Sequence, residues 1–272
     1  MDGIRHAIFR IVTAGTGMTV RHLFYRLVAA GVVEKTEAEY DGTVARLTVE
    51  LRRTGDIPYG KIIDGSRLYS MPRIYDGIEH ALNDIASTYR RSYWREAPID
   101  LEIWCEKDAI RGLIEDVTWE LAAPLMVCRG FSSESVVQAL AEATKLSRKP
   151  RVILSLNDFD PSGSLMLADI IRQASHYAPG CRFISEQIAL TREQVTEYRL
   201  PTRPTKISGN PHAARFTDPE SVELDAMEAD DLRTLLRTAI ESYMEPRALL
   251  VIQAAEESER EGLRQLVAGL AA

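Results

Sequence analysis

Short uninterrupted apolar runs alternate with amphipathic helical stretches between residues 98 and 190, and this alternation limits the possible folds more than any other feature. The apolar runs cover 101–105, 124–128, 152–156 and 183–190, and the helical stretches between them cover 108–121, 133–146 and 162–177. Continuous apolar strands are typical of parallel sheets, in which a helix joins each strand to the next. We therefore predict an α/β fold with a four-stranded parallel sheet.

The first 97 residues show helical periodicity instead. Helices are predicted around 4–12, at 20–30 and at about 37–53, and glycines at 15–17, 31 and 55 end them. A small hairpin is predicted around a turn at Pro58 and Gly60, between isoleucines at 57 and 62–63. Three helices followed by a hairpin are the order of a winged helix-turn-helix. A helical tail over about 71–93 is predicted to lead out of it.

The remaining residues predict a helical extension from about residue 191. A short helix and a proline-rich passage precede two helical stretches, which begin at Asp230 and at about Pro246. At roughly 100 to 200 residues per domain, a chain of 272 residues has room for two domains. We place them at 1–97 and 98–272.

Composition excludes several classes of protein. The 45% hydrophobic and 27% charged residues are typical of a globular protein rather than a disordered one. We expect a cytoplasmic protein with no membrane contact, because the sequence has no apolar run of about 18 residues and no signal-peptide pattern. Three cysteines without paired spacing argue against a disulfide framework or a zinc ribbon.

The charge distribution locates any contact with a polyanion in the first segment. The net charge is −7, but residues 1–98 carry 14 basic and 12 acidic side chains, a balance of +2. The arginines of this segment are interleaved with aromatic residues, a pattern that suits a DNA backbone but also describes an ordinary solvated helix face.

Three carboxylates follow predicted strands at the edge of the sheet where parallel α/β proteins place their chemistry. Glu106 follows the first apolar run, and Asp158 and Asp160 follow the third. Such a trio repels itself and favours a hard divalent cation such as Mg²⁺. Alternatively, the aspartates cap the helix that begins at Pro161, which explains one aspartate but not Glu106.

These strings resemble a known family. Residues 106–109 (EKDA) and 158–163 (DFDPSG) are similar to the Rossmann-like Toprim domain, and most of all to the A subunit of topoisomerase VI and its meiotic double-strand-break relative. Residues 21–25 (RHLFY) resemble the Arg-x-x-Tyr-Tyr signature of that family's winged helix, although Phe24 replaces the first tyrosine. Residues 222–226 (VELDA) resemble its late acidic motif, and Asn157 stands where the family commonly has glycine.

The resemblance implies a compact member of the topoisomerase VI A family that cleaves DNA with magnesium. Tyr25 would be the nucleophile that forms a 5′-phosphotyrosyl bond, and Arg21, one helical turn earlier, would bind the scissile phosphate or lower the phenol pKa. Glu106, Asp158 and Asp160 would bind Mg²⁺, with Glu106 also a proton donor. DNA contacts are predicted for Arg21, Arg26, Arg52, Arg53, Arg67 and Lys107.

The family also implies partners. The tyrosine of one subunit meets the carboxylates of the other, so we expect a homodimer on double-stranded DNA at the nucleoid. Strand passage would need a separate ATPase subunit of the B type.

Alternatives remain open from the residues alone. Tyr25 can equally be a core aromatic, and a Toprim nuclease in which water attacks would need only the carboxylates. A protein that binds DNA without cleaving it is a third reading. We interpret His22 as a neighbouring surface residue, and Glu223 and Asp225 as accessory metal ligands or as carboxylates at a helix start.

Overall fold

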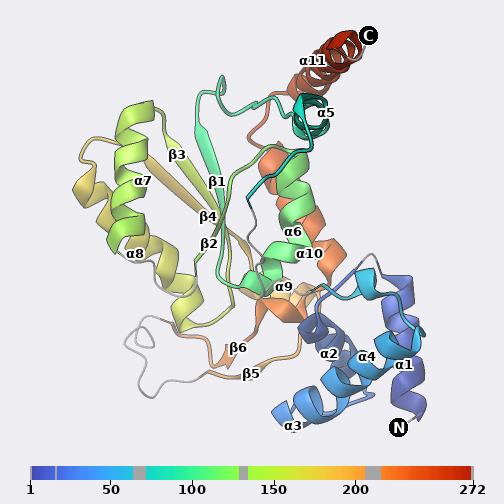
Figure 1. Ribbon diagram of the computed structural model, residues 1–272. Coiled ribbons are helices and arrows are strands. Elements are labelled where there is room, and N and C mark those ends of the chain that lie inside the picture. The colour runs from blue at the N-terminus through green and yellow to red at the C-terminus, as the bar shows by residue number, and fades with distance from the viewer. Residues whose placement is uncertain (1, 16, 64–71, 129–133, 206–215, 271–272) are drawn as a thin grey trace.

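The structure is a computed structural model that describes residues 2–15, 17–63, 72–128, 134–205 and 216–270 (Figure 1). In chain order, its helices are α1 (Asp2–Ala14), α2 (Val20–Ala29), α3 (Glu37–Glu39), the π-helix η1 (Tyr40–Ala45), α4 (Arg46–Thr54), the 3-10 helix η2 (Tyr59–Lys61), α5 (Ile78–Thr88), α6 (Asp108–Glu120), α7 (Glu134–Ser147), α8 (Pro161–Tyr177), α9 (Arg192–Glu197), the 3-10 helix η4 (Leu224–Ala226), α10 (Ala229–Glu241) and α11 (Ala248–Leu270). Its strands are β1 (Asp100–Cys105), β2 (Leu125–Val127), β3 (Arg151–Leu156), β4 (Phe183–Ala189), β5 (Arg203–Pro204) and β6 (Glu220–Ser221).

Strands β1 to β4 form one sheet in the order β2-β1-β3-β4, and all of its pairings are parallel. The predicted α/β fold with a four-stranded, Rossmann-like parallel sheet is therefore confirmed. Helices α7 and α8 cover one face of the sheet, and α6 and α10 cover the other (Figure 1). On β3, Ile153 packs on the face covered by α7 and α8, whereas Val152 and Leu154 pack on the face covered by α6 and α10. This alternation explains why the whole strand is apolar.

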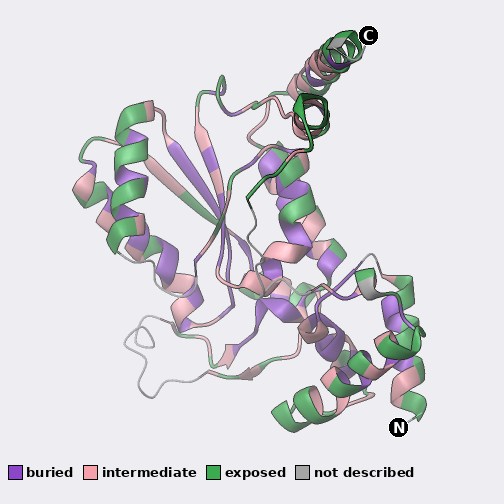
Figure 2. Cartoon of the chain, viewed as in Figure 1, coloured by how far each residue is buried: buried purple, intermediate pink, exposed green. Residues whose placement is uncertain are grey.

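The N-terminal helices have a hydrophobic core of their own. Ile8 of α1, Leu23 and Leu27 of α2, and Leu47 of α4 are buried together in it. The Thr19 hydroxyl caps α2 by accepting a hydrogen bond from the His22 backbone N–H at 3.1 Å. The predicted third helix is present but contains the π-helix η1 between α3 and α4. Figure 2 shows buried residues on these helices and on the sheet.

The predicted hairpin at 57–63 is wrong. Residues 59–61 form η2, and the Lys61 N–H donates to the Pro58 carbonyl at 3.1 Å. Ile62 instead pairs with Met18 in an isolated parallel bridge. Pro58 has no N–H to donate to a strand ladder, and the compact turn buries Ile57 in the helical core. The described residues of the N-terminal segment thus form helices but no two-stranded wing.

Helix α5 packs against the C-terminal helix α11, and the pair projects from the α/β layers (Figure 1). Helix α5 covers residues 78–88 and is therefore shorter than the helical tail predicted at 71–93. Glu256 of α11 is buried, accepts a hydrogen bond from the Arg91 N–H at 2.8 Å and pairs with Arg90 at 3.1 Å.

The division of the chain into two domains at residue 97 stays a prediction. Within the described ranges, no helix is long and apolar enough to cross a membrane.

Candidate functional site

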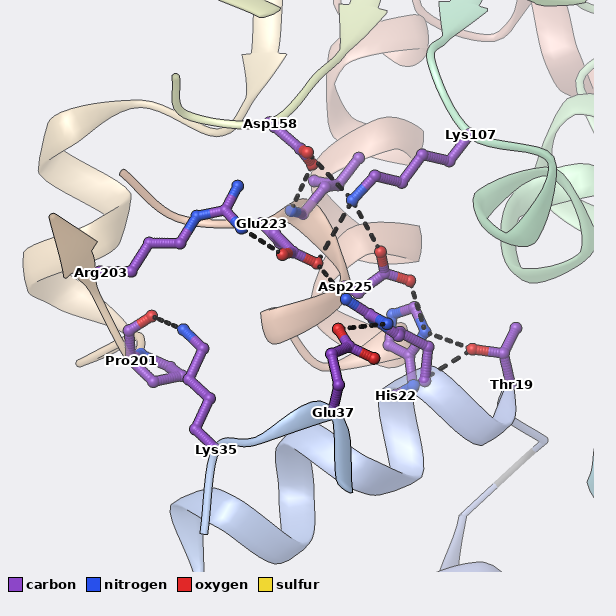
Figure 3. A network of polar contacts seen from close by, with 12 residues as sticks. Thr19, His22, Lys35, Glu37, Lys107, Asp158, Pro201, Arg203, Glu223 and Asp225 are labelled. Atoms are coloured by element: carbon purple, nitrogen blue, oxygen red, sulfur yellow. Dashed lines mark hydrogen bonds and ion pairs between the residues drawn. The ribbon is translucent and has the colours of Figure 1, made fainter. Parts of the chain in front are cut away.

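Lys107 lies at the centre of a carboxylate cluster at the carboxyl edge of the sheet. It follows β1, and its Nζ lies 3.0 Å from Asp158 Oδ2, just beyond β3. The same Nζ lies 2.9 Å from Asp225 Oδ2 and 3.7 Å from Glu223 Oε2 (Figure 3). Burial lowers the Lys107 pKa, but these carboxylates outweigh it and raise the pKa above its ordinary value. The ammonium is therefore charged and holds the cluster together.

The segment at 222–225 supplies two of these carboxylates. Val222 forms an antiparallel bridge with Phe159, which lays the segment against the end of β3. The Leu224 N–H donates to Asp158 Oδ1 at 2.8 Å, so both oxygens of Asp158 are engaged. Asp225 and Glu223 are buried as a result.

Helix α2 brings Tyr25 and Arg21 to the same cluster. The Arg21 Nη2 lies 3.2 Å from Glu223 Oε2, and its guanidinium lies 5.9 Å from the centre of the Tyr25 ring. The Tyr25 phenol interacts with the Glu223 carboxylate. A continuous polar network thus runs from Tyr25 through Glu223 and Lys107 to Asp158.

The Tyr25 phenol is held in its neutral form in this arrangement. The residue is only 3% exposed, and burial is the largest cause that raises its pKa above the ordinary value. The charge of Glu223 and hydrogen bonding to it raise the pKa further, and the nearby Arg21 only partly offsets them. Tyr25 therefore belongs to the hydrophobic core of the N-terminal helices, and the charge of Glu223 acts on its hydroxyl.

His22 was interpreted as a surface residue, and this is wrong. It is 2% exposed, its Nδ1 lies 3.0 Å from Thr19 Oγ1, and the same atom lies 3.7 Å from Asp225 Oδ1. Burial lowers the His22 pKa to about 4, although Asp225 raises it. The imidazole is neutral at pH 7, and the 222–225 segment covers it.

Asp160 and Glu106 differ in their surroundings. The Asp160 side chain caps α8 by accepting from the Gly163 N–H at 2.7 Å, which is the predicted alternative to metal binding. Glu106 is half-buried, and its Oε2 is a buried atom without a hydrogen-bond partner. Burial, followed by the charges of Asp158 and Asp160, raises the Glu106 pKa to about 7. A cation bound beside Glu106 would relieve this repulsion between the negative charges.

The carboxylates fit a divalent cation in donor type but do not form a closed cage. Glu106, Asp158 and Asp160 all offer hard oxygen ligands, and Glu106 Oε2 is a buried atom without a hydrogen-bond partner. Among the residues that the structure describes, however, no three Asp, Glu, His or Cys side chains are placed to hold one metal ion. Asp158 is instead satisfied by Lys107 and a backbone N–H.

The other predicted DNA-binding arginines lie apart from the cluster or are paired. Arg26 Nε lies 2.8 Å from Glu228 Oε1. Arg52 and Arg53 lie in the last turn of α4, where Arg53 is exposed. Arg67 lies outside the described residues.

Two cations of the network were missed by sequence reasoning. Arg203 Nη1 lies 2.7 Å from Glu223 Oε1, and Lys35 Nζ lies 5.2 Å from the centre of the Tyr25 ring. Neither belongs to a recognisable motif. Lys35 lies in the connection after α2, and Arg203 lies on the two-residue strand β5. The carboxylates at 223 and 225 did have a signal, the VELDA string. No protein-family model matches this chain, and no curated protein matches it with significant similarity.

Proposed function

We propose that the protein breaks phosphodiester bonds of double-stranded DNA by transesterification, with Tyr25 as nucleophile, in the manner of the A subunit of topoisomerase VI. One observation carries the proposal. Tyr25 and Arg21 of the N-terminal helices form one network with the carboxylates at the carboxyl edge of the parallel sheet. Aromatic hydroxyl, guanidinium and acidic groups are the parts that this reaction needs.

In this proposal each side chain has a separate task. Arg21 binds the non-bridging oxygens of the scissile phosphate. Tyr25 attacks the phosphorus in line after its phenol proton has passed to water. The new bond is a 5′-phosphotyrosyl ester, and the leaving group is the 3′ oxygen. Glu106, which lies beside Asp158 and Asp160, would be the group that protonates that oxygen.

Glu106, Asp158 and Asp160 would be the ligands of a Mg²⁺ ion. When bound, it supplies positive charge against the charge that grows on the phosphate oxygens. The orphaned oxygen of Glu106 supports this assignment. The engagement of Asp158 by Lys107 means that loading requires this ion pair to loosen.

The finer structural assignments are part of the same proposal. We assign the N-terminal helices to a winged-helix DNA-binding domain, although residues 57–63 do not form its wing. We assign the α/β unit to the Toprim class. A homodimer would place two such sites across a duplex at the nucleoid. Each site would lie within one chain, whereas the family resemblance implies a tyrosine from one subunit and carboxylates from the other. Strand passage would need a separate ATPase subunit.

The experiment is a cleavage assay on supercoiled plasmid with Mg²⁺, followed by denaturation and separation of protein-bound DNA. We expect protein attached to 5′ ends with the parent protein, and no attached protein with Tyr25→Phe. Tyr243→Phe is the matched control, because that hydroxyl contacts Glu186 at 3.1 Å, away from the cluster. An adduct that survives Tyr25→Phe would remove Tyr25 from the reaction.

Hydrolysis by water is the second candidate, and the burial of Tyr25 favours it. It predicts free ends that persist in Tyr25→Phe and disappear in Asp158→Ala. Retained DNA binding without cleavage in every form would instead indicate a non-catalytic DNA-binding protein.

A further inference from the structure

Besides Lys107, the Glu223 carboxylate has cations from three other segments around it. Arg203 of β5 lies 2.7 Å from its Oε1, and Arg21 of α2 lies 3.2 Å from its Oε2. Lys35, from the connection after α2, lies 5.2 Å from the centre of the Tyr25 ring and donates to the Pro201 carbonyl at 3.2 Å (Figure 3). Each oxygen of one buried anion therefore has its own guanidinium.

This arrangement has the features of a phosphate site. Guanidinium groups bind phosphate oxygens in the same way as carboxylate oxygens, with short charge-assisted hydrogen bonds. The Tyr25 ring carries the hydroxyl that would attack the phosphorus, and its centre lies 5.9 Å from the guanidinium of Arg21, which contacts the same carboxylate. The cations repel one another unless an anion lies between them, so the site needs negative charge whether or not DNA is bound.

Arg203 separates this site from the rest of the cluster. Within the described part of the chain, Glu223 is the carboxylate that its guanidinium contacts. Lys107, by contrast, is shared among three carboxylates, and Arg21 also lies 3.5 Å from Glu37. If Glu223 left, Arg203 would retain no acidic partner from these residues and would be ready for an incoming anion.

We propose that Glu223 occupies the binding site of a DNA backbone phosphate, which Arg21 and Arg203 form beside the Tyr25 hydroxyl. The inference rests on the proposed function and adds to it a phosphate ligand, Arg203, and a built-in competitor, Glu223. A phosphate that displaces Glu223 takes over both guanidinium contacts. It also removes from Tyr25 the carboxylate that helps to raise the phenol pKa. The closed arrangement is thus an inactive state that DNA opens.

The test measures DNA binding without catalysis, by fluorescence anisotropy of a labelled duplex in the presence of EDTA. Glu223→Gln should bind about tenfold more tightly than the parent, because the competing charge is gone. Arg203→Gln should bind about tenfold more weakly, and the slope of log affinity against log salt should fall by about one.

Two matched controls lie on the same side of the molecule but outside the site. Glu220→Gln and Arg192→Gln break an exposed pair with a separation of 3.1 Å, and both should bind DNA as the parent does. Thermal unfolding checks folding of each variant. Arg203 keeps the test valid if Glu223→Gln does not fold, because its side chain is 34% exposed and its removal leaves no buried void.

Inorganic phosphate is a second probe that separates this inference from the proposed function. Phosphate should raise the Tm of Glu223→Gln and leave that of Arg203→Gln unchanged. If this occurs but no form binds DNA, the anion site stands and the DNA-cleaving function fails. If the parent binds and cleaves DNA while Glu223→Gln and Arg203→Gln match their controls, the pair is a structural ion pair and the inference is overturned.

Discussion

Replacing Lys107 with methionine removes the cation from the carboxylate cluster while keeping a side chain of similar length. The ammonium lies 2.9 Å from Asp225 and 3.0 Å from Asp158, whose side chains are only 3% and 9% exposed. Removing one partner of a buried ion pair costs about 3–5 kcal/mol of unfolding free energy, since a charge is left uncompensated. The Lys107 side chain is 27% exposed, so water reaches the site and we expect about 3 kcal/mol.

Urea unfolding followed by far-ultraviolet circular dichroism measures this loss. The control is Lys145→Met on α7, because that exposed lysine pairs with Glu142 at 2.7 Å, three residues away on the helix. Such a surface pair is worth less than about 1 kcal/mol. Adding Asp225→Asn to Lys107→Met should recover about 1 kcal/mol or more, because it removes one stranded charge.

Divalent cations provide a second measurement on the same variant. The position that the ammonium vacates lies among oxygens of Asp158, Glu223 and Asp225, so MgCl₂ should stabilise Lys107→Met more than the parent protein. A stability loss no larger than that of Lys145→Met, with no recovery by Asp225→Asn, would refute the view that this ammonium compensates buried charge.

Two further predictions concern neighbours of the cluster. The folded-state pKa of His22 is about 4 and its ordinary value is 6.5, so its contribution to stability is complete above pH 6.5 and is lost as the pH falls towards 4. Between pH 7.5 and pH 5 the stability difference between the parent and His22→Gln should shrink by about 2 kcal/mol in urea titrations; a constant difference would contradict neutral burial. At Gly163, an added Cβ would overlap the Asp158 carbonyl oxygen and press on Asn157. Gly163→Ala should therefore lower the unfolding free energy by about 1–3 kcal/mol. Gly180 is the control, because its φ is +86° and an added Cβ there would contact no neighbour. Gly180→Ala therefore reports backbone strain alone.

The sheet and its edge were predictable because their signals are local. Continuous apolar runs and the helices between them give parallel strands, and the ends of parallel strands meet at one edge. Glu106 and Asp158 therefore lie where the strand pattern placed them. The cap formed by Asp160 was also readable, because proline follows it at the start of α8.

The hairpin and His22 show where local patterns fail. A proline-glycine turn between isoleucines is compatible with a hairpin or a helical turn, and the choice depended on Met18, which pairs with Ile62. His22 is flanked by arginines and was expected at the surface. Its burial comes from a segment about two hundred residues further along the chain.

The amino-acid sequence by itself determined the parallel sheet, the helices that cover it and the edge at which the acidic residues gather, because each depends on hydrophobic patterns within a few turns of chain. Only the tertiary structure decided the state of each charged group. Arg21 and Glu223 are 202 positions apart, yet their contact sets the surroundings of Tyr25. Burial and ion pairing arise from such long-range neighbours, and they determine whether a tyrosine is free to react or is held neutral beside a carboxylate.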